Sequence, residues 1–531
     1  MTVRTRFAPS PTGSVHIGGI RTALYAYAYA KHYKGEFILR VEDTDRKRFV
    51  TGSIENIIDN LNLYGVPADL QPDKESIERA EKEGTKDISE PNWILEIDKL
   101  KEINEDDFDN IYIQSQRLPL YQKYALELLE KGNAYICFAT AEQLAQLRKE
   151  ADEKKQRFIY KGQFEKYALN EETLTRIKNG EKFVVRLNVE KYMNEKGVNE
   201  VTYDGTVYPL NEVDDQVLMK SDGIPTYHLA VVVDDHFMKI THAMRAAEWI
   251  PSTPKQVMLY DMLGWDMPQY IHVTAILNPN GKGKLSKRDG SVSSAEFLQE
   301  GYLPEAMLNF LMLLGWSSPE KHEHGAKERE FYTLSEFVEL FDIQNLNKSN
   351  PVFNREKLLW FNQKYLSNLP NDSFVLKFTQ WLKDYDKNEE LNGVIVEKGP
   401  DYLGNVLLLI KERVRLLAEI PEMIRPFYIS DFKVDLSCNK QTDKIDKSVF
   451  VDLLNDFKQI YQENENIVKW AHEGWEATVR ELAEKYNIKA GQAFMGLRLV
   501  ILGTPFSPPL FESMVALGDE ECIKRLNRFL D

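Results

Sequence analysis

The sequence predicts an α/β domain at the amino end, a mixed insertion within it and an all-helical carboxyl part. Its first 45 residues follow the order strand, glycine-containing loop, helix and strand, which is typical of a βαβ unit. Residues 133–213 alternate short strands with charged helices, and amphipathic helical patterns dominate after about residue 330. Because 531 residues exceed what one hydrophobic core supports, we expect several domains.

In the first unit, a strand is expected at Val3–Ala8 and a helix at Ile20–His32, with Gly35 as the carboxyl-terminal cap of that helix. A second strand, Glu36–Glu42, alternates apolar residues with their neighbours and places acidic side chains at its far end. Ligands of parallel sheets bind outside the carboxyl ends of the strands. We therefore expect Glu42 to lie in a binding site.

Later segments define the remaining parts. The acidic stretch Gly65–Tyr112 is expected to be a partly helical surface insertion, and helical periodicity returns at Arg117–Gly132. Strand and helix resume at Asp214–Asp235. In the carboxyl half, Glu412–Ile420 and Val479–Tyr486 have amphipathic helical patterns, which indicate an all-helical module.

Composition excludes some classes of protein. No apolar stretch approaches the roughly 20 residues of a membrane span, and the amino terminus lacks an apolar signal core, so we expect a cytoplasmic protein with no membrane partner. A net charge of -16 argues against general coating of DNA, since phosphate binding relies on Lys and Arg. Local basic patches could still bind a selected nucleic acid.

The first candidate site runs from Arg6 to Gly19 and contains His16 and Gly18. Glycines between a strand and a helix let a nucleotide approach the backbone, while the helix amino terminus offers N–H groups and a positive dipole. His16 could donate to a phosphate that gains charge in the transition state. The alternative is that a chance His-x-Gly pair makes a tight turn.

The second candidate site is the run Lys284-Leu-Ser286-Lys287-Arg288, which lies among glycines. Clustered cations on a flexible loop suit a departing pyrophosphate, because nucleotidyl transfer depends on electrostatic stabilisation. A solvated basic loop is the alternative.

The third candidate site combines Tyr227, Asp234, Asp235, Arg245 and Trp249 within a short span. The aromatic residues could belong to the core, and the aspartates could form a loop or a helix cap. For Arg245 the alternative is a structural salt bridge.

Taken together and in this order, the three sites resemble the catalytic half of class I aminoacyl-tRNA synthetases. HIGG is similar to the HIGH signature of that family, and KLSKR to its KMSKS signature. The glutamyl branch is the closer match, since PSPTGxxHIGG, VEDTD, YIQSQR, YHLAVVVDDH, ITHAMRAAEW and ILNPNGKGKLSKR resemble its segments. The resemblance covers most of residues 1–310 and continues more faintly to the end.

The resemblance implies an α/β Rossmann-type catalytic domain with an inserted α+β subdomain, followed by all-α carboxyl-terminal domains. The implied parts are a catalytic domain at 1–117 and 214–268 with an acidic insertion at 66–111, an acceptor-stem-binding subdomain at 118–213, a stem-contact region with the KLSKR loop at 269–369, and a helical anticodon-binding region at 370–531. In the last region, basic side chains on amphipathic helices are candidates for anticodon contacts: Arg413, Arg415, Lys489, Arg498, Lys524 and Arg525. Solvated helix faces are the alternative.

The resemblance also assigns site residues. The glutamate site would consist of Arg6, Ala8, Ser10, Glu42, Tyr227 and Arg245. The ATP site would consist of His16, Gly18, Gly19, Glu248, Ile276, Lys284, Ser286 and Lys287, of which His16, Lys284 and Lys287 would be catalytic. Glu42 would pair with the α-ammonium group, and the arginines would bind carboxylates, which suits the planar guanidinium. Val231 stands where some relatives have an asparagine, so no polar contact is assigned to it.

The implied activity is ligation of L-glutamate to tRNA(Glu) through a glutamyl-adenylate, with ATP and Mg²⁺ and without a protein nucleophile. We expect a monomer. We expect no structural zinc, because Cys137 is followed two places later by Ala139, and the nearby segment from Tyr160 supplies no second thiol or imidazole.

Several alternatives stay open. The enzyme could be non-discriminating and also charge tRNA(Gln), it could be a glutaminyl enzyme, or it could be a non-catalytic RNA-binding paralogue. The intact His16, Glu42, Lys284 and Lys287 argue against the paralogue. An oxidoreductase of Rossmann type is disfavoured because no G-x-G-x-x-G follows the first strand.

Overall fold

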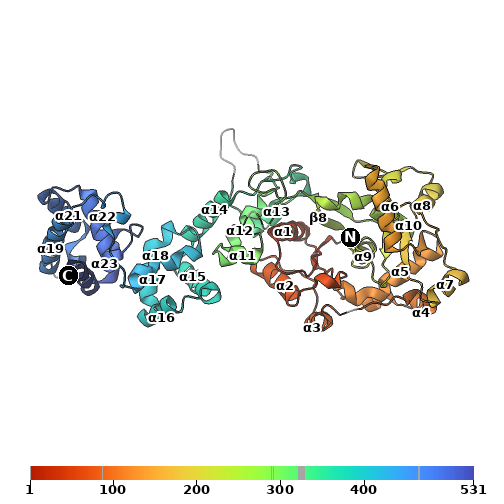
Figure 1. Ribbon diagram of the computed structural model, residues 1–531, viewed down its shortest axis with the longest axis horizontal. Helices are drawn as coiled ribbons and strands as arrows, with labels where there is room; N and C mark the ends of the chain where they lie inside the picture. The colour runs from red at the N-terminus through yellow and green to blue at the C-terminus, as the bar shows by residue number, and fades with distance from the viewer. Residues whose placement is uncertain are drawn as a thin grey trace. The chain divides into compact units, whose positions relative to one another are not determined.

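The computed structural model describes residues 2–86, 88–286, 288, 290, 292–320, 329–464 and 467–531. They form two compact units, Met1–Ala295 with Leu308–Phe353 and Glu296–Met307 with Asn354–Asp531 (Figure 1). The chain passes from one unit to the other within the helices α11 (Ser294–Gln299) and α12 (Pro304–Met312). The division between 369 and 370 that the resemblance implies stays a prediction.

A four-stranded parallel sheet forms the centre of the first unit. Its strands lie in the order β2 (Glu36–Leu39), β1 (Arg4–Phe7), β8 (His242–Ala246) and β9 (Gln269–Val273). All three pairings are parallel, so the carboxyl ends of the strands meet at one edge. The predicted α/β class is confirmed.

The helix α1 (Ile17–His32) joins β1 to β2 and begins three residues earlier than predicted. Its amino end is fixed by His16, whose side chain accepts a hydrogen bond from the backbone of the first turn. The predicted cap at Gly35 is wrong, because Lys34 is the residue with positive φ, 54°. Gly35 is needed for close packing instead: a Cβ there would lie 2.0 Å from the carbonyl oxygen of Val3.

The acidic insertion is partly helical, as predicted, and it is anchored in the core. The helix α2 (Ser53–Leu63) precedes it, and the helices α3 (Lys74–Glu83) and α4 (Ile97–Lys101) lie within it. Trp93 and Ile94 are buried in the main hydrophobic core of the unit. The outer surface of this segment is acidic, but its path is set by apolar packing.

An antiparallel sheet and several helices form the inserted α+β subdomain, which confirms this part of the predicted fold (Figure 1). Its elements are α5 (Leu118–Glu130), β3 (Ala134–Cys137), α6 (Ala141–Glu153), α7 (Glu171–Lys178), β4 (Val184–Leu187), α8 (Val189–Lys196), the hairpin β5 (Glu200–Tyr203) and β6 (Thr206–Pro209), and β7 (Val217–Met219). The buried Cys137 Sγ lies 3.2 Å from the Tyr160 hydroxyl oxygen. Zinc binding stays untested.

Two adjacent buried carboxylates in α9 (Tyr227–Phe237) connect the sheet to the inserted subdomain. Asp235 accepts hydrogen bonds from Arg40 Nη1 at 2.6 Å and from Arg6 Nε at 3.2 Å. Asp234 accepts a hydrogen bond from Arg117 Nε at 2.8 Å. The interpretation of these aspartates as a loop or cap is therefore wrong; they lie within a helix and neutralise buried arginines.

The environment of Asp234 is completed by neutral donors. Gln114 Nε2 donates to it at 2.8 Å and the Tyr121 hydroxyl at 2.9 Å.

Burial raises the pKa of Asp235, but the coulombic effect of Arg6 and Arg40 outweighs burial and holds the pKa below its usual range. Because this pKa is depressed in the folded state, the stabilisation is present at neutral pH and is lost as pH falls.

The second unit is helical, as predicted. The remaining helices of the first unit are α10 (Thr253–Leu263) and α13 (Leu334–Leu340). Those of the second unit are α14 (Arg355–Asn368), α15 (Asn371–Tyr385), α16 (Glu389–Lys398), α17 (Pro400–Ile410), α18 (Ile420–Tyr428), α19 (Lys447–Glu463), α20 (Ile467–Trp470), α21 (His472–Lys485), α22 (Ala490–Leu502), α23 (Leu510–Leu517) and α24 (Asp519–Leu530). Among the described residues, no helix has the length and apolar character needed to cross a membrane.

The prediction of a helix at Glu412–Ile420 is wrong. Two short 3₁₀ turns, Lys411–Arg413 and Leu417–Glu419, lie in this segment with non-helical residues between them, and α18 begins at Ile420. Val414, Leu417 and Ile420 are buried at a spacing of three, which both a 3₁₀ path and an amphipathic helix produce. The pattern therefore predicted the buried face but not the backbone conformation.

We predict that Asp235→Asn destabilises the first unit by about 3–5 kcal/mol, because it removes the carboxylate that Arg6 and Arg40 share and leaves Arg40 with its longer contacts to Glu42 and Asp234. Hydrogen exchange followed by mass spectrometry should show loss of protection in β1 and α9, with the second unit unchanged. The control is Glu127→Gln on α5, which removes only an exposed i,i+4 pair with Lys131. Wild-type protection of α9 in Asp235→Asn would contradict this role.

Candidate active site

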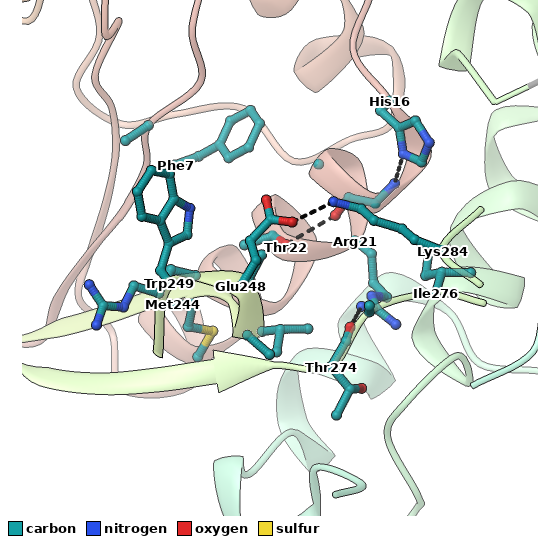
Figure 2. A pocket seen from close by; sticks show the side chains of 18 of the residues that line it. Phe7, His16, Arg21, Thr22, Met244, Glu248, Trp249, Thr274, Ile276 and Lys284 are labelled. Atoms are coloured by element: carbon teal, nitrogen blue, oxygen red, sulfur yellow. Dashed lines mark hydrogen bonds and ion pairs between the residues drawn. The ribbon is translucent and has the colours of Figure 1, made fainter. Parts of the chain in front are cut away.

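A cavity of about 580 Å³ lies at the carboxyl edge of the parallel sheet. It is bounded by the end of β1, the start of α1, the end of β8 and the segments that follow β9 (Figure 2). Every described residue of the predicted glutamate and ATP sites lines it: Arg6, Ala8, Ser10, His16, Gly18, Gly19, Glu42, Tyr227, Arg245, Glu248, Ile276, Lys284 and Ser286. Lys287 lies outside the described residues.

His16 is oriented by the first turn of α1. Its Nδ1 accepts a hydrogen bond from the Gly18 backbone N–H at 3.0 Å, so in the neutral ring the proton is on Nε2. Nε2 is thus a hydrogen-bond donor, and it lies at the amino end of α1, which is the positive end of the helix dipole. A Cβ at Gly18 would lie 3.2 Å from His16 Nδ1, so glycine keeps this arrangement undisturbed. This corner of the cavity is suited to an anion.

Arg6 and Glu42 lie in the cavity wall with partners of opposite charge. Arg6 is paired with Asp235, as described above, and its Nη1 donates to the Met244 carbonyl at 2.9 Å. Glu42 accepts a hydrogen bond from Arg40 Nη2 at 3.2 Å. Burial raises the pKa of Glu42, and Arg40 and Arg6 oppose that rise. A cation in the cavity would add a further stabilising charge beside this carboxyl group.

An aromatic pair forms another part of the wall. The rings of Tyr227 and Trp249 are stacked, with centroids 4.0 Å apart and an interplanar angle of 29°. Burial, followed by the nearby Glu42, raises the pKa of Tyr227, so its hydroxyl stays protonated at neutral pH. It can therefore donate a hydrogen bond into the cavity.

Arg245 lies at the end of β8 and is buried, with 5% of its surface exposed. Its Nε donates to His272 Nε2 at 3.1 Å, its Nη1 to Gln256 Oε1 at 2.5 Å and its Nη2 to Thr253 Oγ1 at 2.8 Å. The Tyr270 ring covers the guanidinium, with its centroid 3.9 Å from Cζ. A guanidinium has five N–H donors, so one on each terminal nitrogen is left for a bidentate acceptor.

Lys284 and Glu248 point toward one another across the cavity (Figure 2). Lys284 Nζ lies 2.7 Å from Glu248 Oε2, and both side chains are more than half exposed. An exposed pair of this kind contributes little to stability. The lysine can therefore exchange Glu248 for a phosphate at small cost.

Sequence reasoning missed Arg21 and Thr274. Arg21, in α1, is buried and lines the cavity, and it donates to the carbonyl oxygens of Leu314, at 2.7 Å, and Thr274 (Figure 2). A single arginine within the apolar run that follows HIGG was the available signal. Its carbonyl partners come from distant segments, which no local pattern indicates.

A second cavity of about 850 Å³ adjoins the first. Both are lined by Ser10, Glu42, Tyr227 and Trp249. The other residues of the second cavity include basic side chains from three segments: Arg46, Lys47, Arg48, Lys86 and Lys220. Although it is larger, it holds few of the predicted site residues, so the first cavity is the candidate active site.

In the helical unit, several basic candidates are engaged within the protein. Arg413 Nη1 and Arg498 Nη1 donate to the Ser507 carbonyl at 2.6 and 2.9 Å. Arg525 is buried and binds Glu521 and the Ile501 carbonyl. Because Arg525 is buried, it is not a candidate for RNA contact. Arg413 and Arg498 bind the loop that contains the exposed Phe506.

Known proteins agree with this architecture. Residues 2–360 match the family "tRNA synthetases class I (E and Q), catalytic domain", and residues 373–530 match "Anticodon binding domain". A glutamate–tRNA ligase of Finegoldia magna is 38% identical, with 100% of this chain and 99% of that protein covered. A glutamate–tRNA ligase of Clostridioides difficile is 36% identical, with 99% and 98% covered.

Two solved structures are also similar over the whole chain. A glutamate tRNA ligase of Elizabethkingia meningosepticum, in complex with its amino acid, has a TM-score of 0.76 at 31% identity and covers 100% of this chain and 99% of its own. The glutamate-tRNA synthetase of Elizabethkingia anophelis has a TM-score of 0.77 at 31% identity, with 100% of both chains covered. The chain belongs to the glutamate–tRNA ligase family of the class I tRNA synthetases.

Proposed function

We propose that this protein activates L-glutamate with ATP and transfers it to tRNA(Glu). The observation that carries the proposal is a single cavity that contains both an anion-binding helix start, at His16, and the buried Arg245 without a carboxylate partner among the described residues. The first feature suits the phosphates of ATP, and the second suits the side-chain carboxylate of glutamate.

In the first step, the glutamate α-carboxylate attacks the α-phosphorus of ATP, and pyrophosphate leaves. Glu42 would pair with the α-ammonium group, while His16 Nε2–H and Lys284 would stabilise the negative charge that develops on the phosphates. In the second step, a terminal ribose hydroxyl of the tRNA attacks the carbonyl of the adenylate, and AMP leaves. The protein contributes position and charge rather than a nucleophile.

Mg²⁺ is expected to accompany ATP, since it is usually bound through substrate phosphates and water, and it would neutralise charge on the leaving group. In the described ranges, no three His, Cys, Asp or Glu side chains gather in a way that could hold a metal ion. We therefore assign no protein ligands to Mg²⁺. The absence of structural zinc, the monomeric state and the cytoplasmic location stay predictions.

The second cavity supports a route for the tRNA end. It shares the aromatic pair with the first cavity, and its lysines Lys47 and Lys86 suit a phosphate backbone, while Arg46, Arg48 and Lys220 form ion pairs with Asp43, Asp45 and Asp222. We propose that residues 118–213 bind the acceptor stem, that 269–369 contact the stem and that 370–531 bind the anticodon. In this layout, both ends of the tRNA contact the chain.

The proposal is tested by charging purified tRNA(Glu) and tRNA(Gln) with each amino acid. Glutamylation of tRNA(Glu) alone is expected. Glutamylation of both tRNAs would identify a non-discriminating enzyme, and glutaminylation would identify the glutaminyl alternative. Binding of tRNA without any charging would indicate the non-catalytic paralogue and contradict the proposal.

We predict that Lys284→Ala slows glutamate activation by about 2.7–4 kcal/mol in activation free energy, which is typical of removing one preorganised donor. Exchange of labelled pyrophosphate into ATP, with tRNA present, measures this step. The matched control is Lys282→Ala, since Lys282 is an exposed lysine of the same loop that does not line the cavity. Equal exchange rates in the two variants would remove Lys284 from the mechanism.

We predict that Arg245→Met abolishes the preference for glutamate over glutamine. A site built around a polar partner can reject the wrong ligand by about 10⁴–10⁵, and most of that ratio should disappear with the guanidinium. Arg245→Lys is the second variant, because it keeps the charge but lacks the bidentate geometry. Measurements of kcat/KM for both amino acids decide, and an unchanged ratio in a folded Arg245→Met protein would refute this role.

A further inference from the structure

The side chains that hydrogen-bond to Arg245 or cover it are neutral. Gln256, Thr253 and the Tyr270 ring carry no formal charge, and burial together with the nearby Arg245 lowers the pKa of His272 to about 4. His272 is therefore neutral at physiological pH and can accept the hydrogen bond from Arg245. Among the described residues, Arg245 forms no ion pair.

Several other buried arginines of the same unit have carboxylate partners, whereas Arg21 and Arg186 donate to backbone carbonyl oxygens. Arg6 and Arg40 pair with Asp235, and Arg117 pairs with Asp234. Pairing with a carboxylate is the ordinary way to stabilise a buried cation. The fold can therefore supply such partners. Arg245 differs from both groups, because neutral side chains accept its hydrogen bonds.

The amide of Gln256 strengthens this point. Its Oε1 faces Arg245, so its Nε2 points elsewhere, and this buried Nε2 has no hydrogen-bond partner in the part of the chain that the structure describes. A carboxylate at this position would pair with the guanidinium and would also remove the unpaired N–H groups. Glutamine at position 256 instead keeps the guanidinium charge unpaired and leaves one of its own polar atoms without a partner among the described residues.

We propose that Gln256, Thr253 and His272 are positioning residues that hold Arg245 in place without neutralising it, and that this absence of an internal counterion sets the preference for glutamate over glutamine. Thr253 and Gln256 lie three residues apart on one face of α10, and His272 lies on β9. Together they fix three of the five donors and leave the charge for the ligand. The inference rests on the proposed function, in which Arg245 binds the side-chain carboxylate of the amino acid.

The argument is one of charge balance. When glutamate binds, its carboxylate supplies the missing counterion in a buried site, where the interaction is strong. Glutamine supplies only a carbonyl oxygen and an NH₂ group that arginine cannot accept. If the protein itself supplied a carboxylate, Arg245 would already be neutralised, and the new carboxylate would repel the glutamate side chain. The discrimination between glutamate and glutamine would then fall.

The test is Gln256→Glu in the full-length protein, with kcat/KM measured for glutamate and for glutamine on tRNA(Glu). The KM for glutamate should rise, and the glutamate-to-glutamine ratio should fall by at least about tenfold, as expected for coupling between close charges. The matched control is Gln256→Met, which has similar size and no charge. It removes one hydrogen bond to Arg245 but adds no charge, and Thr253 and His272 still hold the guanidinium, so the ratio should stay close to wild type even if both rates fall.

The folding of the variants is monitored by thermal unfolding, and Thr253→Asp is the second variant, which places a carboxylate beside Nη2 instead. A fall of the ratio in either folded acidic variant, with the ratio retained in Gln256→Met, supports the inference. A wild-type ratio in both acidic variants overturns it. A wild-type protein that does not charge glutamate would overturn the proposed function as well, so the two failures are distinguishable.

Discussion

Asp234 and Asp235 connect α9 to β1, to the end of β2 and to the start of α5 through buried ion pairs. Between them they bind Arg6 from β1, Arg40 from the end of β2 and Arg117 before α5. Each of these ion pairs is buried, so removal of one partner leaves an uncompensated charge inside the protein. The mutual position of the sheet, α9 and the inserted subdomain thus depends on two adjacent carboxylates in one helix. The cavity lies directly beside this cluster and contains Arg6 itself.

In the cavity, the buried charge of Arg245 is not neutralised by a carboxylate of the described residues. In the supporting cluster every arginine is matched by a carboxylate, whereas Arg245 is held by Thr253, Gln256 and His272. A balanced cluster gives rigidity, and an unbalanced cation gives affinity for an anionic ligand. The two arrangements lie in the same unit, so the rigid cluster can hold the unbalanced group in place.

Sequence patterns predicted the parallel α/β unit, the mixed insertion and the helical carboxyl part, because periodicity of 2 and 3.6 follows directly from burial. The resemblance to class I synthetases, and not periodicity, assigned the glutamate and ATP residues, and those that the structure describes line one cavity. The sequence patterns failed where a conformation or a burial depends on contacts between residues far apart in the sequence. Gly35 is required by the approach of Val3, Glu412–Ile420 contains short 3₁₀ turns with helix-like burial, and Asp234 and Asp235 are charges buried by distant arginines. The neutral partners of Arg245 come from α10 and β9, and no motif contains them.

The central claim is that this cavity selects the acidic amino acid by an uncompensated guanidinium. It can be measured without tRNA charging, by determining inhibition constants for the non-hydrolysable sulfamoyl analogues of glutamyl-adenylate and glutaminyl-adenylate. The two analogues share the adenosine and differ only in a carboxylate or an amide at the side-chain end. The account predicts that the glutamyl analogue binds more tightly by on the order of 10⁴. Equal inhibition by the two analogues would contradict it.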